Sequence, residues 1–202
     1  MTNALRVYRI PFSTNVERIA LAAACKGIEL EWIDVDPEDR SAVVAVSGQP
    51  LVPVLDHEGR IVFDSTAILY YLDELGPEPR LFRTREIEIF VDWFNRVWKV
   101  PPNEIEAEWL NPEPDATRVA ELGAEMTRAL DLFERLLAGR EHLFGDFSAA
   151  DCAAFPFLKY ALDDNEDDSE PFHQILREFQ PLGEEHARLA AWIRRVDEYP
   201  RA

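Results

Sequence analysis

Three short segments of the sequence carry residues that could hold a small anionic ligand. The first is Phe12–Arg18 (FSTNVER), where Ser13 precedes a predicted helix. The free N–H groups and positive dipole end of a helix start stabilise an anion, and for a thiolate they lower the pKa from about 8.5 into the physiological range. Ser13 beside them would help to hold a nucleophilic thiol. The alternative is a plain helix cap, because Thr14 and Glu17 fit the capping-box pattern.

The second segment is Gln49–Leu55 (QPLVPVL), in which Pro53 stands at the start of an apolar strand. Because proline cannot donate a hydrogen bond to a strand ladder, a turn with a cis Val52–Pro53 bond is one physical answer. A cis bond would turn the N–H and C=O of Val52 outward, ready to pair with an extended peptide. The alternative is an edge strand in which Pro53 faces water.

The third segment is Asp64–Ser65, which leads a predicted helix ending at Leu75. The free N–H groups of that helix start suit a carboxylate ligand. Either residue could equally be an ordinary helix cap. Each segment alone is therefore ambiguous, whereas the three together suggest one ligand site.

The elements that position these segments are strands alternating with helices. Apolar residues recur at helical spacing from Val16 to Ala23, and His57-Glu58-Gly59 suits a hairpin turn. We therefore expect one small sheet with helices packed on it. The expected strands are Leu5–Ile10, Leu30–Val35, Val52–Leu55 and Arg60–Phe63, with helices from Val16 and over Ser65–Leu75 and a short helix or irregular link at Val43–Val46.

The clearest break in the chain is Gly76–Pro79, where two prolines flank an acidic residue. Every long segment after it has helical period, so we expect a sheet-containing domain over 1–76, a linker over 77–83 and an all-helical domain over 84–202. The expected helical stretches are Ile87–Trp98, Val119–Leu137, Ser148–Leu162 and Glu184–Glu198.

Composition argues against several classes of partner. The 202 residues carry a net charge of −18, and this field repels phosphate backbones and anionic lipid headgroups, so we expect neither a nucleic acid nor a membrane partner. The stretch Met1–Ile10 lacks a secretory signal pattern. Cys25 and Cys152 lack a CxxC or Cys/His spacing, which predicts a cytoplasmic protein without a disulfide framework or structural metal.

At this point the sequence resembles the cytosolic glutathione transferase superfamily over nearly its whole length. The resemblance implies a thioredoxin-like α/β N-terminal domain with a cis proline at Pro53, followed by an all-α helical-bundle domain. Within the last of its motifs, Ser148 and Asp151 are expected to cap a helix and to have no catalytic role. The residues that carry the resemblance are Ser13-x-Asn15-x-x-Arg18, Val52-Pro53, Asp64-Ser65 with Ala67-Ile68, the proline-rich link into Leu81-Phe82, and Gly145–Asp151.

The resemblance also implies a site for the tripeptide glutathione. The cysteinyl part of glutathione would pair with the backbone of Val52, and Asp64 with Ser65 would hold the γ-glutamyl end. Ser13 matches the catalytic position, so the chain looks like the serine type, in which the hydroxyl donates a hydrogen bond to the thiolate.

Three further residues belong to this expected site. Tyr8, on the first expected strand, is the alternative catalytic hydroxyl. Gln49 is separated from Val52 by Pro50-Leu51, whereas the family usually runs Gln directly into Val-Pro. Arg40 is the basic residue expected to pair with the glycyl carboxylate.

A second substrate is expected against the start of the helical half, where Trp93, Arg96 and Trp98 precede Pro101-Pro102. A kink at the two prolines could open a pocket, and Arg96 beside aromatic rings would favour an anionic or carbonyl-bearing electrophile. The alternative is that these tryptophans pack inside the bundle or at a dimer contact.

The acidic run Asp163–Glu170 resembles the start of a calcium loop. However, Asp168 stands where such a loop needs glycine, and Gln174 stands where it needs the bidentate Glu. We therefore expect a solvated loop and no metal site.

The sequence leaves more than one function open. The first hypothesis is a cytoplasmic, homodimeric enzyme of detoxification that uses glutathione as co-substrate and adds its thiol to an electrophilic small molecule. The alternatives are a non-catalytic binding or scaffold module, a thiol-dependent isomerase, or an enzyme that uses another low-molecular-weight thiol. Fold alone does not choose among them.

Overall fold

The computed structural model describes residues 5–76, 78–165 and 167–202. Residues 1–4 of the expected untargeted N-terminus, Pro77 of the expected linker and Glu166 of the acidic run lie outside these ranges. The chain forms two compact units, of which one runs to Thr84 and includes Tyr199–Ala202, and the other is Arg85–Glu198. Among the described helices, none is both long and apolar enough to cross a membrane.

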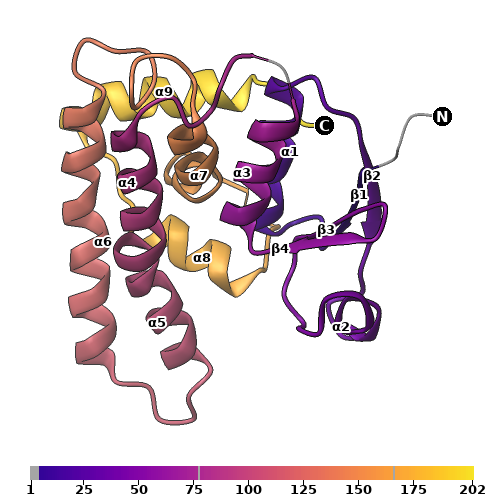
Figure 1. The fold of residues 1–202 in the computed structure, drawn as a ribbon. Coiled ribbons are helices and arrows are strands. Elements are labelled where there is room, and N and C mark those ends of the chain that lie inside the picture. The colour runs from indigo at the N-terminus through magenta and orange to yellow at the C-terminus, as the bar shows by residue number, and fades with distance from the viewer. Residues whose placement is uncertain (1–4, 77, 166) are drawn as a thin grey trace. The chain divides into compact units, whose positions relative to one another are not determined.

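The first unit contains a four-stranded mixed sheet (Figure 1). Its strands are β1 (Leu5–Arg9), β2 (Leu30–Asp34), β3 (Val54–His57) and β4 (Arg60–Phe63), in the spatial order β2-β1-β3-β4. β1 is parallel to β2 and antiparallel to β3, and β3 and β4 form the expected hairpin. The third strand begins two residues later than predicted, since Pro53 has no N–H to give to the ladder.

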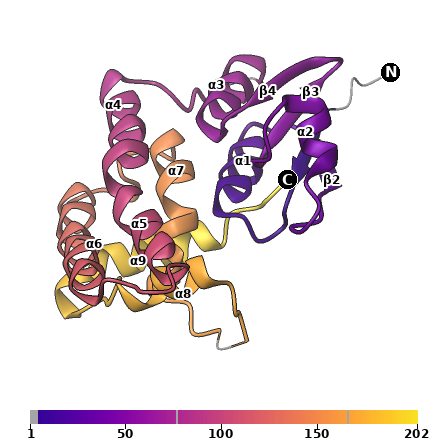
Figure 2. The same cartoon turned by 90° about the horizontal axis from the view of Figure 1, so that it is seen from below.

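Three helices cover this sheet, namely α1 (Thr14–Cys25), α2 (Ser41–Ser47) and α3 (Ser65–Leu75). α1 and α3 contact each other, and α2 lies apart from both (Figures 1 and 2). Strand alternation explains the arrangement, because neighbouring residues of a strand face opposite sides of the sheet. Tyr8 and its partner Val54 face a cluster that contains Val43 of α2, whereas Val7 and Leu55 are buried on the other face.

Two buried cations on α1 hold α3 beside it. Lys26 Nζ donates to Asp73 Oδ1 (3.2 Å) and to the Asp73 carbonyl oxygen (3.3 Å), and Arg18 Nη1 donates to Ser65 Oγ (3.3 Å). Lys26 is 2% exposed and Arg18 is 0% exposed. Arg18 precedes Lys26 by eight residues, and Ser65, the partner of Arg18, precedes Asp73 by the same number. Because the partners follow one another in the same order, α1 and α3 run parallel and start at the same edge of the unit.

The same ion pair fixes the segment that follows α3. Lys26 Nζ also donates to the carbonyl oxygen of Pro79 (3.0 Å), and the Asp73 carboxylate accepts the N–H groups of Leu81 (2.6 Å) and Phe82 (3.2 Å). The Leu81 side chain is fully buried. The described part of the expected linker is therefore an ordered part of the first unit.

The chain returns to the first unit in its last residues. Ala202 N donates to Ala20 O (3.1 Å), Trp32 Nε1 donates to Ala202 O (2.8 Å), and Arg201 Nη2 lies 3.0 Å from Glu17 Oε1. We expected 84–202 to form one helical domain. The hydrogen bonds of Ala202 and the ion pair of Arg201 place Tyr199–Ala202 with the first unit instead.

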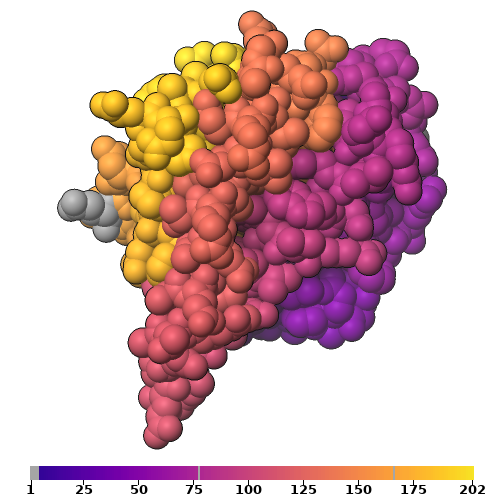
Figure 3. Space-filling view, turned by 90° about the vertical axis from the view of Figure 1, so that its left-hand side faces the viewer, coloured from indigo at the N-terminus to yellow at the C-terminus, as the bar shows by residue number. Residues whose placement is uncertain are grey.

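The second unit is helical, and aromatic rings form much of its core. Phe94 stacks on Trp98 with ring centroids 4.5 Å apart, while Phe133 and Phe157 meet Phe94 edge-on. Residues of α6 and α9 lie side by side on one face of this unit (Figure 3), and the Leu189 N–H at the start of α9 donates to Glu134 Oε2 near the end of α6 (2.8 Å). The helices are α4 (Arg85–Trp93), α5 (Val100–Trp109), α6 (Ala116–Leu136), α7 (Ala149–Leu158), α8 (Pro171–Glu178) and α9 (Ala187–Asp197), with a π-helical turn at Phe94–Trp98 and 3₁₀ turns at Lys159–Ala161 and Glu184–His186.

Two of these helices, α5 and α8, were not predicted, and both have proline in the first turn. An N–H group in the first turn of a helix has no acceptor within that helix. The missing N–H groups therefore cost no hydrogen bond at Pro101, Pro102 and Pro171. The expected kink at Pro101-Pro102 is replaced by the π turn before it, where Lys99 N–H donates to Phe94 O, five residues back (3.0 Å).

The predicted cap of α7 is present and buried. Ser148 N–H donates to Asp151 Oδ2 (2.9 Å) and the Ala150 N–H donates to Ser148 Oγ (3.3 Å). Asp151 also accepts hydrogen bonds from the Leu143 N–H (3.1 Å) and from Trp192 Nε1 (2.8 Å). Burial raises the pKa of Asp151, and these donors oppose that shift. The pair ties three segments of the helical unit together.

Replacing Asp73 by Ala is expected to lower the free energy of unfolding by about 3–5 kcal/mol, because the buried Lys26 ammonium loses its carboxylate and the Leu81 and Phe82 N–H groups lose their acceptor. Lys26→Met should cost less, since Asp73 keeps those backbone donors. Glu74→Gln removes the same charge from an exposed position of α3 and should change stability by less than about 0.5 kcal/mol. Urea unfolding followed by circular dichroism measures all three, and equal losses in Asp73→Ala and Glu74→Gln would contradict the assignment.

Candidate functional site

Ser13 stands at the N-cap of α1, with an extended backbone (φ −70°, ψ 123°). Its carbonyl oxygen accepts the N–H groups of Val16 (3.0 Å) and Glu17 (3.1 Å), while its hydroxyl forms no hydrogen bond that caps the helix. The alternative cap of Thr14 with Glu17 is also not used, since Ser13 is the N-cap and Glu17 pairs with Arg201. The half-buried Ser13 hydroxyl is therefore available to a ligand at the helix start.

Asp64 is the N-cap of α3, and its side chain is partly committed to that helix. Its Oδ1 accepts the N–H groups of Thr66 (2.8 Å) and Ala67 (3.1 Å), so the ordinary cap is formed. Its Oδ2 accepts no hydrogen bond from the described residues. The backbone of Asp64 is at φ 73° and ψ 125°, a conformation that L residues rarely adopt and that concentrates at ligand sites.

Ser65 joins the first turns of α1 and α3. Its hydroxyl accepts a hydrogen bond from Arg18 Nη1 (3.3 Å) and donates one to Asn15 Oδ1 (3.4 Å). The sequence marked Asn15 and Arg18 only as members of a motif with Ser13. The structure adds their physical role, which is to hold the start of α3 beside the start of α1.

The bond between Val52 and Pro53 is cis, as the sequence analysis suggested. Pro53 is buried, and the half-buried Val52 packs against the hydrophobic cluster that contains Val54. Tyr8, the alternative to Ser13, packs against the same cluster. The Tyr8 side chain is thus part of the packing on the α2 face of the sheet.

Gln49 and Arg40 both bind the backbone of the loop before Pro53. Gln49 Nε2 donates to Leu51 O (2.9 Å) and its Oε1 accepts the Leu51 N–H (2.6 Å). Arg40 donates to the carbonyl oxygens of Pro37 (3.1 Å) and Pro50 (3.4 Å). These bonds fix the loop that is two residues longer than the family pattern. Backbone carbonyls also hold the Arg40 guanidinium in place without neutralising its charge.

The three residues expected to contact a second substrate lie in different surroundings within the helical unit. Trp93 is half-buried, with its ring 5.6 Å from Phe90 and 6.2 Å from Phe133. Arg96 is exposed and pairs with Asp92 (2.6 Å). Trp98 is only 3% exposed and belongs to the aromatic core, so Trp93 and Arg96 are the members of this set that reach the surface.

The acidic run forms a loop in its described part, although two of its carboxylates are less solvated than expected. Arg177 Nη2 lies 2.9 Å from Asp163 Oδ2 and also pairs with Asp168, which further contacts His173 Nδ1 (2.7 Å). Among the residues that the structure describes, no group of three His, Cys, Asp or Glu side chains is placed to hold a metal ion.

A mixed β2-β1-β3-β4 sheet with a cis proline before its third strand, followed by a helical unit, defines a thioredoxin-like domain joined to an all-α domain. Comparison with family models agrees with this class. The model described as "Glutathione S-transferase, N-terminal domain" matches residues 7–80, and that described as "Glutathione S-transferase, C-terminal domain" matches residues 116–195. The chain belongs to the glutathione S-transferase superfamily, as the resemblance in its sequence indicated.

Known relatives are distant in sequence. Glutathione transferase omega-1 of Caenorhabditis elegans is 34% identical over 86 residues, which are 42% of this chain and 34% of that protein. A glutathione S-transferase of Silene vulgaris is 23% identical over 219 residues, covering 95% of this chain and 92% of that protein. The crystal structure of rice GST1 in complex with glutathione superposes with a TM-score of 0.75 at 22% identity, covering 99% of this chain and 93% of that one, which confirms the fold.

The cap and the backbone conformation of Asp64 can be separated by two substitutions. Asp64→Ala should lower the free energy of unfolding by about 0.5–2 kcal/mol, because the Thr66 and Ala67 N–H groups lose their acceptor. Asp64→Gly loses the same cap but has no Cβ to strain at positive φ, so it should be more stable than Asp64→Ala by about 1 kcal/mol. Thermal unfolding of the two variants checks this, and a glycine variant less stable than the alanine variant would refute it.

Proposed function

We propose that the protein conjugates the thiol of glutathione to an electrophilic small molecule. The observation that carries this proposal is the Ser13 hydroxyl, which lies at the positive end of α1 and is not used to cap it. A hydrogen bond from this hydroxyl and the nearby helix dipole would stabilise a thiolate over a thiol and so lower the thiol pKa. The thiol proton passes to solvent, and the thiolate sulfur forms a C–S bond with the electrophile. In the same step the electrophile either loses a leaving group with the electron pair of its broken bond, or breaks an activated π bond whose electron pair then takes a proton from solvent. Ser13 keeps its own proton.

The donors and acceptors around Ser13 match the chemistry of glutathione, which has two carboxylates and one ammonium group. We assign the ammonium to the free Oδ2 of Asp64, and the γ-glutamyl carboxylate to Ser65 at the positive dipole end of α3. The Val52 backbone would pair with the cysteinyl residue. Arg40, on the loop that Gln49 braces, would face the glycyl carboxylate. Binding of glutathione by the rice relative supports this assignment.

We assign the second substrate to the surface formed by Trp93 and Arg96 of the helical unit. The half-buried indole offers an apolar face, and the exposed guanidinium, although paired with Asp92, keeps further N–H donors for an anionic or carbonyl-bearing electrophile. Trp98 would support this surface from the core, through its stacking on Phe94.

We further propose that the protein acts in detoxification as a cytoplasmic homodimer. The dimer is supported by family membership and by large apolar side chains that are exposed in each unit, among them Leu51 at 67% and Ile89 at 56%. Cys25 and Cys152 are not joined in a disulfide, which suits a reducing compartment.

Replacing Ser13 by Ala is expected to lower kcat/KM with glutathione by about 10²–10³-fold, because a donor to the developing charge is lost. The pKa of the bound thiol should rise, so the loss should be greatest near neutral pH and shrink as the pH approaches the pKa of free glutathione. Stability should change by less than about 0.5 kcal/mol, since the hydroxyl caps nothing. Steady-state kinetics against pH with a panel of electrophiles measures the effect.

Three controls separate the alternatives to this assignment. Tyr8→Phe should leave turnover unchanged, and a larger loss in Tyr8→Phe than in Ser13→Ala would move the role to Tyr8. Glutathione should raise the melting temperature of the wild-type protein. A protein that glutathione does not stabilise, and that co-purifies with a stable partner, would be a scaffold module, whereas stabilisation by a different thiol would change the co-substrate.

The second-substrate assignment predicts a selective effect of Arg96. Arg96→Gln should raise KM for a carboxylate-bearing electrophile by about three- to tenfold while leaving KM for glutathione unchanged. Arg85→Gln is the matched control, because Arg85, on the preceding helix α4, has a similarly exposed side chain and also pairs with a nearby acid, Glu88. Equal shifts in both variants would show a general charge effect.

A further inference from the structure

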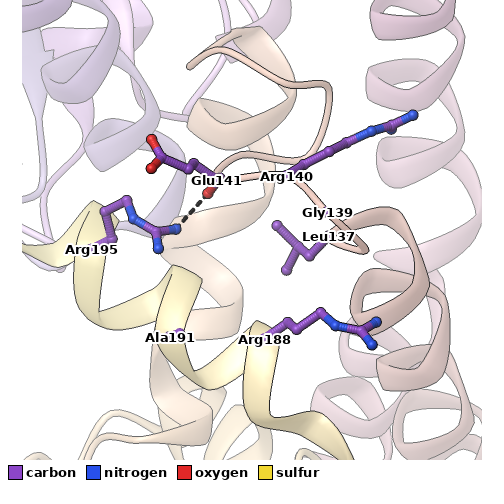
Figure 4. A pocket seen from close by; sticks show the side chains of 7 residues that line it. All are labelled: Leu137, Gly139, Arg140, Glu141, Arg188, Ala191 and Arg195. Carbon is purple, nitrogen blue, oxygen red and sulfur yellow. Dashed lines mark hydrogen bonds between the residues drawn. The ribbon is translucent and has the colours of Figure 1, made fainter.

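A pocket of about 360 Å³ lies within the helical unit, where the end of α6 and the turn after it meet α9 (Figure 4). This volume is at the lower end of the range for small-molecule sites. None of the residues assigned to glutathione or to its electrophile lines this pocket. The lining residues are Leu137, Gly139, Arg140, Glu141, Arg188, Ala191 and Arg195.

Two of the three arginines are held by backbone carbonyls. Arg195 Nη1 donates to Glu141 O (2.6 Å), the bond drawn in Figure 4, and Arg140 Nη1 donates to Leu143 O (3.4 Å). Among the described residues, neither guanidinium has a carboxylate within the 4.0 Å of an ion pair. A carbonyl oxygen orients a guanidinium without cancelling its charge, so both keep their charge and most of their donors.

The third arginine adds little net charge, since Arg188 pairs with Glu134 (Nε to Oε1, 3.6 Å). The pocket therefore keeps an excess of positive charge on a chain whose net charge is −18. The carboxylate of Glu141, which also lines the pocket, offsets one of the charges of Arg140 and Arg195. The remaining positive charge and the unused guanidinium donors favour a ligand that carries a negative group.

The floor of the pocket is apolar. Figure 4 shows the Leu137 side chain between the arginines, with Ala191 on the facing turn of α9. A ligand that fits this lining carries an apolar body for Leu137 and Ala191 and an anionic group for the rim. We propose that this pocket, defined as the arginine-rimmed pocket, binds a small organic anion such as a carboxylate, sulfonate or phosphate ester.

Isothermal titration calorimetry of the full chain with phenyl phosphate, in excess glutathione to fill the first site, tests this proposal. The wild-type protein should bind one phenyl phosphate saturably and bind inorganic phosphate more weakly, because inorganic phosphate has no apolar body. R140Q/R195Q should weaken binding by at least about tenfold, which is the effect of losing charge-assisted hydrogen bonds.

The matched control is R135Q/R194Q, which removes two exposed arginines from the same two segments, neither of which lines the pocket. It should change affinity by less than about twofold. Ala191→Glu, a third variant that fills the pocket with negative charge and leaves the arginines in place, should also abolish binding. Absence of binding to the wild-type protein at millimolar concentration, equal losses in the two double variants, or equal affinity for inorganic phosphate would overturn the proposal.

Discussion

The parallel pairing of α1 and α3 by two buried cations is the constraint on which the first unit depends. A buried ammonium or guanidinium is costly unless it is paired, so Lys26 needs Asp73 and Arg18 needs the polar start of α3. Since the two pairs are separated by the same number of residues on both segments, the starts of α1 and α3 lie at one edge of the unit. Ser13 and Asp64, the N-caps of these two helices, thereby lie at the same edge of the unit, although they are about fifty residues apart in the chain.

What the sequence predicted well was local. Alternation and helical period predicted all four strands and most of α6, whose observed start lies three residues before the predicted Val119. The Ser148–Asp151 cap was confirmed, and it was predictable because its partners lie three residues apart. The ion pair of Lys26 with Asp73 was not predicted, since the two residues are 47 positions apart and no local pattern reveals the pairing. We expected Pro101-Pro102 to kink a helix, whereas in the structure both prolines lie in the first turn of α5.

The candidate site shows the same division. The sequence located Ser13, Asp64 and Ser65, but it could not tell a cap from a ligand contact because both use the same residue types. The geometry distinguishes the two roles. Asp64 caps α3 with Oδ1 only, which leaves Oδ2 without a helix N–H donor, and the Ser13 hydroxyl takes no part in capping α1. The Ser65 hydroxyl is hydrogen-bonded to Arg18 and Asn15. The sequence could not show that Trp98 is buried and Trp93 only half-buried, because the burial of each ring depends on which helices pack around the π turn.

The return of Tyr199–Ala202 to the first unit has a consequence for biosynthesis. The backbone acceptor of Trp32 on β2 is the carbonyl of Ala202, 170 residues further along the chain, and the partner of Glu17 is Arg201. A ribosome releases the strands and helices of the first unit long before these partners exist. The first unit is thus synthesised first but completed last, after the whole helical unit has been made. A chain truncated within α9 would therefore contain a first unit that lacks the hydrogen bonds of Arg201 and Ala202.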